Sequence, residues 1–111
     1  MADRRRGVVW SEAAVRDLEE IAAHVARESP ASAERLVERL WSKAESLRAQ
    51  ARRGRIVAEL LQLGMSTWRE LIVPPYRLVY RIGGSRVIVL GVFDGRRDLQ
   101  DVLLERLLRD V

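Results

Sequence analysis

The spacing of apolar residues changes once along this chain, and that change limits the folds it can adopt. From residue 12 to residue 47, apolar side chains recur every three or four positions, as on one side of a helix. From residue 68 to residue 93 they alternate or run together, as in strands. A helical block followed by a strand block predicts an α+β domain, with helices packed on an antiparallel sheet.

The helical block divides into two helices. Ser11 offers an N-cap for the first, and Ser29 offers one for the second. Pro30 suits the first turn of the second helix, because its missing N–H is not needed there. Each helix carries one apolar stripe and almost no linker separates them, so we expect an antiparallel hairpin that hides both stripes.

The strand block holds three candidate strands, at residues 68–73, 76–82 and 86–93. Pro74-Pro75 separates the first two, and "GGS" at 83–85 turns the chain between the second and third. Within 76–82, the arginines point to the face opposite the tyrosines. Residues 86–93 are apolar on both faces, which predicts a central strand covered on both sides.

Shorter segments complete a β-α-α-β-β-β-α order. Residues 8–10 predict an N-terminal strand, and Asp98 can cap a C-terminal helix. Gly54 is expected to end the second helix as its C-terminal cap, while residues 56–67 have no secure assignment. The C-terminal helix has an apolar arc wider than a surface helix needs, formed by Leu99, Val102, Leu103, Leu104, Leu107, Leu108 and Val111.

The composition removes several classes of site. The 111 residues suit one domain spanning residues 1–111, and the 48% hydrophobic content argues against disorder. There is no cysteine and one histidine, His24, which excludes thiolate or histidine metal sites and hydrolytic triads. The carboxylates Asp17, Glu19 and Glu20 lie on the polar side of a helix, where solvated charge is expected.

No apolar run approaches the roughly 18 residues that a membrane helix needs. The opening "MADRRRGVVW" has a basic cluster but no apolar region after it, so it does not resemble a secretory signal. We therefore expect a cytoplasmic protein without membrane contact, metal or cofactor.

The charge balance favours an anionic partner. The formal net charge is +4, and the isoelectric point is about 10.6. Four arginines on the strands or at strand ends could hold phosphates, because a guanidinium group can donate two parallel hydrogen bonds to phosphate oxygens. They are Arg77, Arg81, Arg96 and Arg97. The alternative is that these arginines pair with Glu70, Asp94 and Asp98 on an exposed face.

The order of elements and several local sequence segments resemble the RelE/ParE superfamily of toxins from type II toxin–antitoxin modules. "SEAAVRDLEEIAAHVARESPASA" resembles the ParE-type opening, and "GRIVAEL" with "WRELIVPPYRLVYRI" resembles the middle of the family pattern. "VIVLGVFDGRRDL" resembles its closing strand. The resemblance implies a toxin that is held silent by a cognate antitoxin, acidic and partly disordered, which folds on it.

The superfamily implies two ways of acting. RelE-type members cut messenger RNA on the ribosome with basic side chains and a C-terminal tyrosine, whereas ParE-type members bind and poison DNA gyrase. Arg77 and Arg97 match arginines of the nuclease branch. Trp68 and Glu70 stand where that branch has basic residues, and Leu103 stands at or near its tyrosine. The sequence therefore favours a ParE-like gyrase inhibitor, with a RelE-like endoribonuclease or a non-toxic interaction module as alternatives.

The preferred interpretation assigns contacts to both partners. The four arginines would bind the target, and under the nuclease alternative Arg77 and Arg97 would be the catalytic pair. The antitoxin would lie along the helical hairpin and a sheet edge, using apolar positions that serve equally as core. These are Leu18, Ile21, Leu40 and Trp41. We expect the C-terminal helix to dock on its own sheet, with a contact to antitoxin or a second copy as the alternative.

Overall fold

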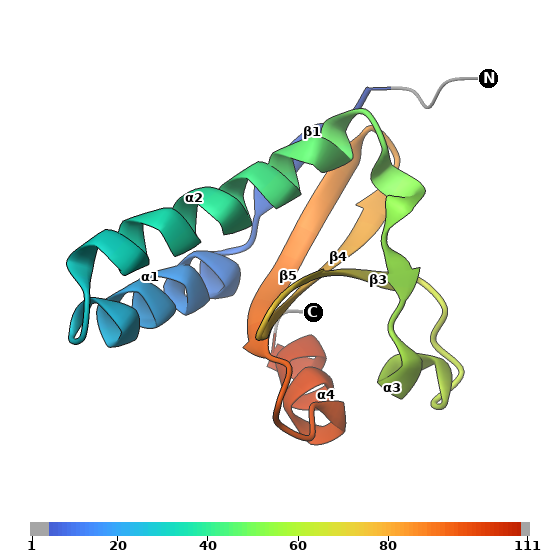
Figure 1. Ribbon diagram of the computed structural model, residues 1–111. Coiled ribbons are helices and arrows are strands. Elements are labelled where there is room, and N and C mark those ends of the chain that lie inside the picture. Colours follow the sequence, from blue (N-terminus) through green and yellow to red (C-terminus); the bar gives the residue numbers. More distant parts are fainter. Residues whose placement is uncertain (1–4, 110–111) are drawn as a thin grey trace.

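The computed structural model, which describes residues 5–109, contains a five-stranded sheet with helices packed on both faces (Figure 1). The strand order is β1-β5-β4-β3-β2. The strands are β1 (Gly7–Trp10), β2 (Arg55–Ile56), β3 (Trp68–Val73), β4 (Tyr76–Gly83) and β5 (Arg86–Asp94). The β1 and β5 strands run parallel and the other pairs antiparallel, so the sheet is mixed. Periodicity assigns faces and not strand directions, so the parallel pair was not visible in the sequence.

The expected helical hairpin is present, with its predicted caps. It consists of α1 (Glu12–Ala26) and α2 (Pro30–Glu45), which lie side by side in Figure 1. The Ser11 hydroxyl oxygen accepts the Ala14 N–H at 3.1 Å. The Ser29 hydroxyl oxygen accepts the Ser32 N–H at the same distance. Each serine thereby satisfies a backbone donor that a helix start leaves unpaired.

Two apolar cores cover the two faces of β4 and β5. The first core joins the hairpin to one face through residues that include Leu36, Leu40, Leu71, Leu78, Tyr80 and Val89. The second core joins α3 (Ala58–Leu61) and α4 (Gln100–Arg109) to the other face. It contains Val57, Leu60, Val79, Leu90, Phe93, Leu99 and Leu103. A central strand covered on both sides was predicted for 86–93, and the structure confirms it.

The C-terminal helix α4 docks on its own sheet, as expected. Leu99 and Leu103 are fully buried in the second core. The outer part of the apolar arc remains at the surface, where Val102 and Leu108 are exposed. Val111, the last member of the predicted arc, lies outside the described residues.

Gly54 does not cap α2, so that prediction was wrong. The α2 helix ends at Glu45, two 3₁₀ turns follow it, and Gly54 has extended backbone with φ of −74°. Its N–H donates to the Tyr80 hydroxyl at 3.0 Å, and that hydroxyl donates to the Ala51 carbonyl at 2.6 Å. Burial raises the pKa of Tyr80, so the phenol stays neutral and keeps both bonds. A glycine is needed here because the backbone passes directly against this hydroxyl.

An ion pair between Asp17 and Arg106 satisfies backbone groups of β5 beyond the point where β1 ends. The pairing of β1 with β5 extends to Trp10 and Val89. Beyond that point Asp17 on α1 accepts the Val92 N–H at 3.0 Å. Arg106 on α4 donates to both Asp17 carboxylate oxygens at 2.8 Å and to the Leu90 carbonyl at 3.1 Å. The expectation that Asp17 is solvated was wrong, because its side chain ties α1, β5 and α4 together.

Gly54→Ala tests the close approach to Tyr80. The new Cβ would lie 2.5 Å from the Tyr80 hydroxyl oxygen and 2.8 Å from the Glu70 carbonyl oxygen. We expect this overpacking to reduce the free energy of unfolding by about 1–3 kcal/mol, measured by urea denaturation. Gly7→Ala is the matched control, since no atom lies within 4 Å of its added Cβ. Equal stability of the two variants would contradict the packing described.

Asp17→Ala tests the tie between the helices. Removing this carboxylate breaks a largely buried ion pair and takes away the acceptor of the Val92 N–H, and breaking such a pair typically costs about 3–5 kcal/mol. The control is Arg109→Ala, because Arg109 forms an exposed pair with Glu105 at 3.9 Å and should cost under about 1 kcal/mol. Thermal unfolding compares the two variants. A loss for Asp17→Ala no larger than for the control would show that the pair does not hold α4.

Candidate functional site

The four arginines predicted to bind the target do not form one cluster. Arg77 lies near the start of β4, and Arg81 lies four residues further along the same strand, which is about 13 Å away. Arg96 and Arg97 lie in the turn that follows β5. Arg96 lines one shallow depression with Arg77, and a second pocket with Arg97. The end of β5 is therefore the place where three of the four arginines come near each other.

Arg77 is occupied by two carboxylates. Its Nε donates to Glu70 at 2.6 Å, and its two terminal nitrogens donate to Glu59 at 2.6 and 2.7 Å. The hydrogen bonds from Arg77 lower the pKa of Glu59, and those carboxylates raise the pKa of Arg77, so both groups stay charged at neutral pH. The Arg77 side chain is only 11% exposed. It would have to break these pairs before it could hold a phosphate.

Glu70 explains why Arg77 is held so firmly. It is only 2% exposed and is the one buried charged residue in the described part of the chain. Besides Arg77, it accepts a hydrogen bond from Arg55 Nε at 2.8 Å. Since a buried carboxylate needs such partners, Arg77 is a structural requirement of this sheet face. The alternative expectation was that Glu70 pairs with an arginine on an exposed face. The pair is present, but Glu70 is buried, so the expected exposure was wrong.

Glu59 is the member of this network that the sequence did not reveal. It lies in α3, inside the segment that had no secure assignment. It approaches Arg77 across 18 residues of sequence, so no local spacing links the two. Only the placement of α3 over the sheet brings this carboxylate to the arginine.

Arg96 has a partner of its own. Its Nε and one terminal nitrogen donate to the Asp94 carboxylate at 2.9 and 2.8 Å, and its backbone N–H donates to the same group at 3.0 Å. These hydrogen bonds lower the pKa of Asp94 to about 2. The pairing with Asp94 agrees with the alternative expectation for this turn. Asp98 instead accepts the Gln100 backbone N–H at 3.2 Å, at the start of α4.

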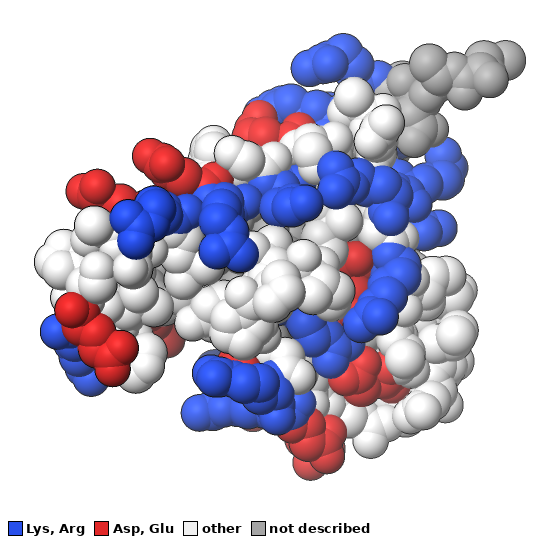
Figure 2. All heavy atoms as spheres, viewed as in Figure 1, with Lys and Arg blue, Asp and Glu red and all other residues white. Residues whose placement is uncertain are grey.

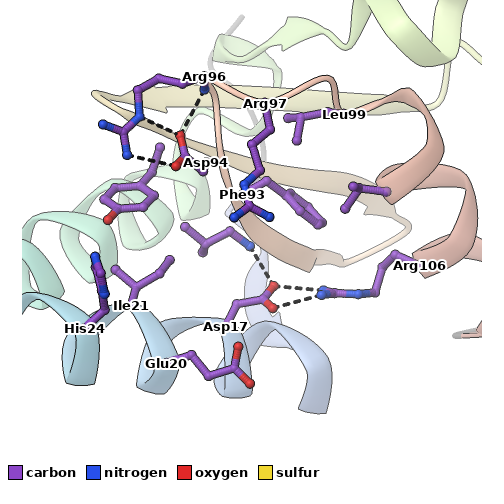
Figure 3. Close-up of a pocket in the computed structure, with 13 residues that line it drawn as sticks. Asp17, Glu20, Ile21, His24, Phe93, Asp94, Arg96, Arg97, Leu99 and Arg106 are labelled. Atoms are coloured by element: carbon purple, nitrogen blue, oxygen red, sulfur yellow. Dashed lines mark hydrogen bonds and ion pairs between the residues drawn. The ribbon is translucent and has the colours of Figure 1, made fainter.

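Arg97 points into a pocket between α1, the end of β5 and α4 (Figure 3). The pocket has a volume of about 380 Å³. Apolar side chains line part of it, including Ile21 and Phe93, while His24 contributes from α1 and the Asp17–Arg106 pair forms another wall. Within residues 5–109, the guanidinium of Arg97 has no hydrogen-bond or ion-pair partner. It is therefore an exposed cation in a pocket of mixed apolar and charged lining, which also includes Glu20 and Asp94, and it has donors available for a carboxylate or phosphate.

The positions predicted for the antitoxin differ in accessibility. Leu40 is 0% exposed and belongs to the first core, so a partner cannot touch it in this conformation. Leu18 and Ile21 are partly buried against that core. Trp41 is 49% exposed and stacks on Trp10, with ring centroids 5.5 Å apart. Trp41 thus offers the apolar surface, beside the edge strand β1.

The remaining nuclease-branch positions lie in the second core. Leu103 is fully buried, and Trp68 packs against the same core. Among residues 5–109 there is also no group of three or more histidine, cysteine or acidic residues that could hold a metal ion. None of the helices in that range is long and apolar enough to cross a membrane.

Known proteins resemble this chain over most of its length. A family model described as "ParE toxin of type II toxin-antitoxin system, parDE" matches residues 8–99. "Toxin RelE2" of Caulobacter vibrioides is 35% identical over 86 residues, which are 77% of this chain and 90% of that protein.

Solved structures share the fold at lower identity. A chain of the chromosomal ParDE toxin–antitoxin system from P. aeruginosa has a TM-score of 0.69 and 21% identity, and the match covers 83% of this chain and 98% of that chain. The toxin–antitoxin complex RelBE2 from Mycobacterium tuberculosis gives a TM-score of 0.58 and 23% identity, over 82% of this chain and 92% of that chain. The chain therefore belongs to the ParE toxin family of type II toxin–antitoxin systems, within the RelE/ParE superfamily.

Proposed function

We propose that this toxin acts by binding DNA gyrase and does not cut RNA. The observation that carries the proposal is the occupied state of Arg77, whose three guanidinium nitrogens all donate to Glu59 and Glu70. An RNA-cleaving site needs cations free to stabilise the charge that develops on the scissile phosphate. Here the arginine of the nuclease branch is neutralised by two carboxylates. The match to the ParE model supports the same branch.

RNA cleavage is the second candidate because one observation favours it. His24 and Arg97 line the same pocket, so an imidazole and an exposed guanidinium, the two kinds of group that RNA cleavage can use, are present on one surface (Figure 3). Against it, Leu103 is buried at or near the place of the family tyrosine, and Glu70 replaces a cation with a carboxylate.

We further propose an acidic antitoxin as the neutralising partner in the cytoplasm. The net charge of +4 favours an anionic partner. The structural neighbours are chains of toxin–antitoxin systems. The exposed Trp41, stacked on Trp10 of the edge strand β1, gives such a partner an apolar anchor beside a row of backbone groups.

Induction of the chain alone in bacteria separates the candidates. A gyrase inhibitor should arrest growth, induce the DNA-damage response and trap gyrase on DNA. Cuts in messenger RNA at fixed codon positions on ribosomes, without trapped gyrase, would contradict the proposal and support the nuclease. Normal growth with folded protein present would instead support a non-toxic interaction module.

Arg97→Glu should abolish toxicity, because it reverses the charge of the exposed cation in the pocket. We expect at least about a 100-fold recovery of plated colonies after induction, with little change in unfolding temperature because the side chain is exposed. The control is Arg86→Glu, which makes the same charge change on an exposed residue at the other end of β5. Equal toxicity of both variants would remove Arg97 from the target contact.

Trp41→Ala should weaken antitoxin binding. Loss of a partly exposed aromatic anchor typically costs about 2 kcal/mol, or about 30-fold in the dissociation constant. Calorimetric titration of the purified toxin with its antitoxin measures the change. Leu63→Ala is the control, since Leu63 is similarly exposed, at 44%, beyond the end of α3. If Leu63→Ala weakened binding as much as Trp41→Ala did, the hairpin placement would be wrong.

A further inference from the structure

A row of cations runs along the outer face of α2. Arg35, Arg39 and Lys43 are exposed and recur every four residues, and exposed Arg53 continues the row beyond the helix. Figure 2 shows a continuous band of lysine and arginine over the region where α2 runs in Figure 1. The four cations line one groove of about 530 Å³. We name these four residues the α2 ridge.

The ridge is not needed to hold the fold together. A separate stripe of α2, about 100° around the helix from the ridge, supplies the core residues Leu36, Leu40 and Ala44. Among residues 5–109, no ridge cation forms an ion pair with a carboxylate. Arg35 and Arg53 donate only to serine hydroxyls, at 3.1 and 3.0 Å. The ridge therefore presents charge that the protein itself does not neutralise.

The spacing and chemistry of the ridge suit a row of phosphates. Four residues of helix advance about 6 Å, so the helical cations form a straight line of evenly spaced charges. Two hydroxyls, of Ser42 and Ser46, line the same groove and are groups that commonly contact phosphates. The groove holds one carboxylate, Glu38, against four cations, so its charge is strongly positive.

Two features separate a nucleic acid duplex from other polyanions. An antitoxin helix would need apolar pockets, but no apolar residue lines this groove, and Trp41, the exposed aromatic residue of α2, lies outside it. A single strand would need aromatic platforms for its bases, yet no aromatic residue lines this groove. A duplex requires neither, because its phosphate backbone can be held by cations and hydroxyls alone.

From these observations we propose that the α2 ridge binds the phosphate backbone of duplex DNA without sequence preference. This surface is separate from the Arg97 pocket, since the two share no lining residue. The two proposals can therefore fail independently. DNA binding is measured without gyrase, and the gyrase proposal does not depend on the ridge.

The test is fluorescence anisotropy of the purified chain with a labelled random-sequence DNA duplex of 20 base pairs. Neutralising three to four phosphates predicts that log K falls against log salt with a slope of about −3 to −4. The variant Arg35→Gln/Arg39→Gln/Lys43→Gln should reduce that slope to about −1 and weaken binding at least tenfold at 50 mM salt. Glutamine preserves helix propensity, so the hairpin should remain folded.

A matched control removes the same charge elsewhere. Arg16→Gln/Arg27→Gln/Arg86→Gln also deletes three exposed arginines, but none lies on α2. It should keep the slope and most of the affinity of the unmodified chain. An equal loss in both triple variants would show that net charge alone acts, and would overturn the proposal. Tighter binding of labelled poly-glutamate, or of single-stranded RNA of the same length, would overturn the duplex assignment.

Discussion

The buried carboxylate of Glu70 is the constraint on which the α3 side of this toxin depends. A charge with 2% exposure must be compensated, and Arg77 and Arg55 provide the compensation at 2.6 and 2.8 Å. Arg77 then extends to Glu59 and fixes α3 over the sheet. One buried charge thereby connects β2, β3, β4 and α3. It also decides which arginines remain available for partners.

The arginines on this side of the sheet consequently have different structural roles. Arg77 stabilises the fold, Arg106 ties α4 to α1 through Asp17, and Arg96 is paired with Asp94 in its own turn. Arg97 alone among the arginines near the end of β5 is exposed with no hydrogen-bond or ion-pair partner within residues 5–109. Because Arg77, which matches an arginine of the nuclease branch, is paired with Glu59 and Glu70, we infer a toxin that binds a macromolecule and does not cut RNA. This pairing is the physical basis of the gyrase proposal.

Local patterns in the sequence predicted most of the fold. Ser11 and Ser29 cap their helices as expected, and the doubly apolar segment 86–93 is the central covered strand. The failures share one cause, which is contact between residues distant in the chain. Gly54 donates a hydrogen bond to Tyr80, 26 residues away, and Asp17 accepts one from Arg106, 89 residues away. Glu59 belongs to a segment with no clear period, so its pairing with Arg77 had no local signal.

The site was predictable only in part for the same reason. The run "VFDGRRD" indicated that Arg96 and Arg97 leave the sheet together, but not that one would be paired and the other free. Charge spacing on α2 was visible as residues 35, 39 and 43, yet its meaning depends on which face of the helix is buried. Packing decides both questions, and packing is a property of the whole chain.

We infer that Arg77 stabilises the fold and does not contact a target. The most direct measurement replaces the buried pair with apolar residues of similar volume, as Glu70→Met/Arg77→Met, and compares toxicity on induction with the unfolding free energy. Such replacements of buried ion pairs are often neutral or stabilising by about 1–4 kcal/mol, and Glu59 is exposed enough to turn to solvent. We expect a folded protein with unchanged toxicity and unchanged trapping of gyrase on DNA. A folded but harmless double variant would contradict it, because Arg77 would then be shown to act on the target.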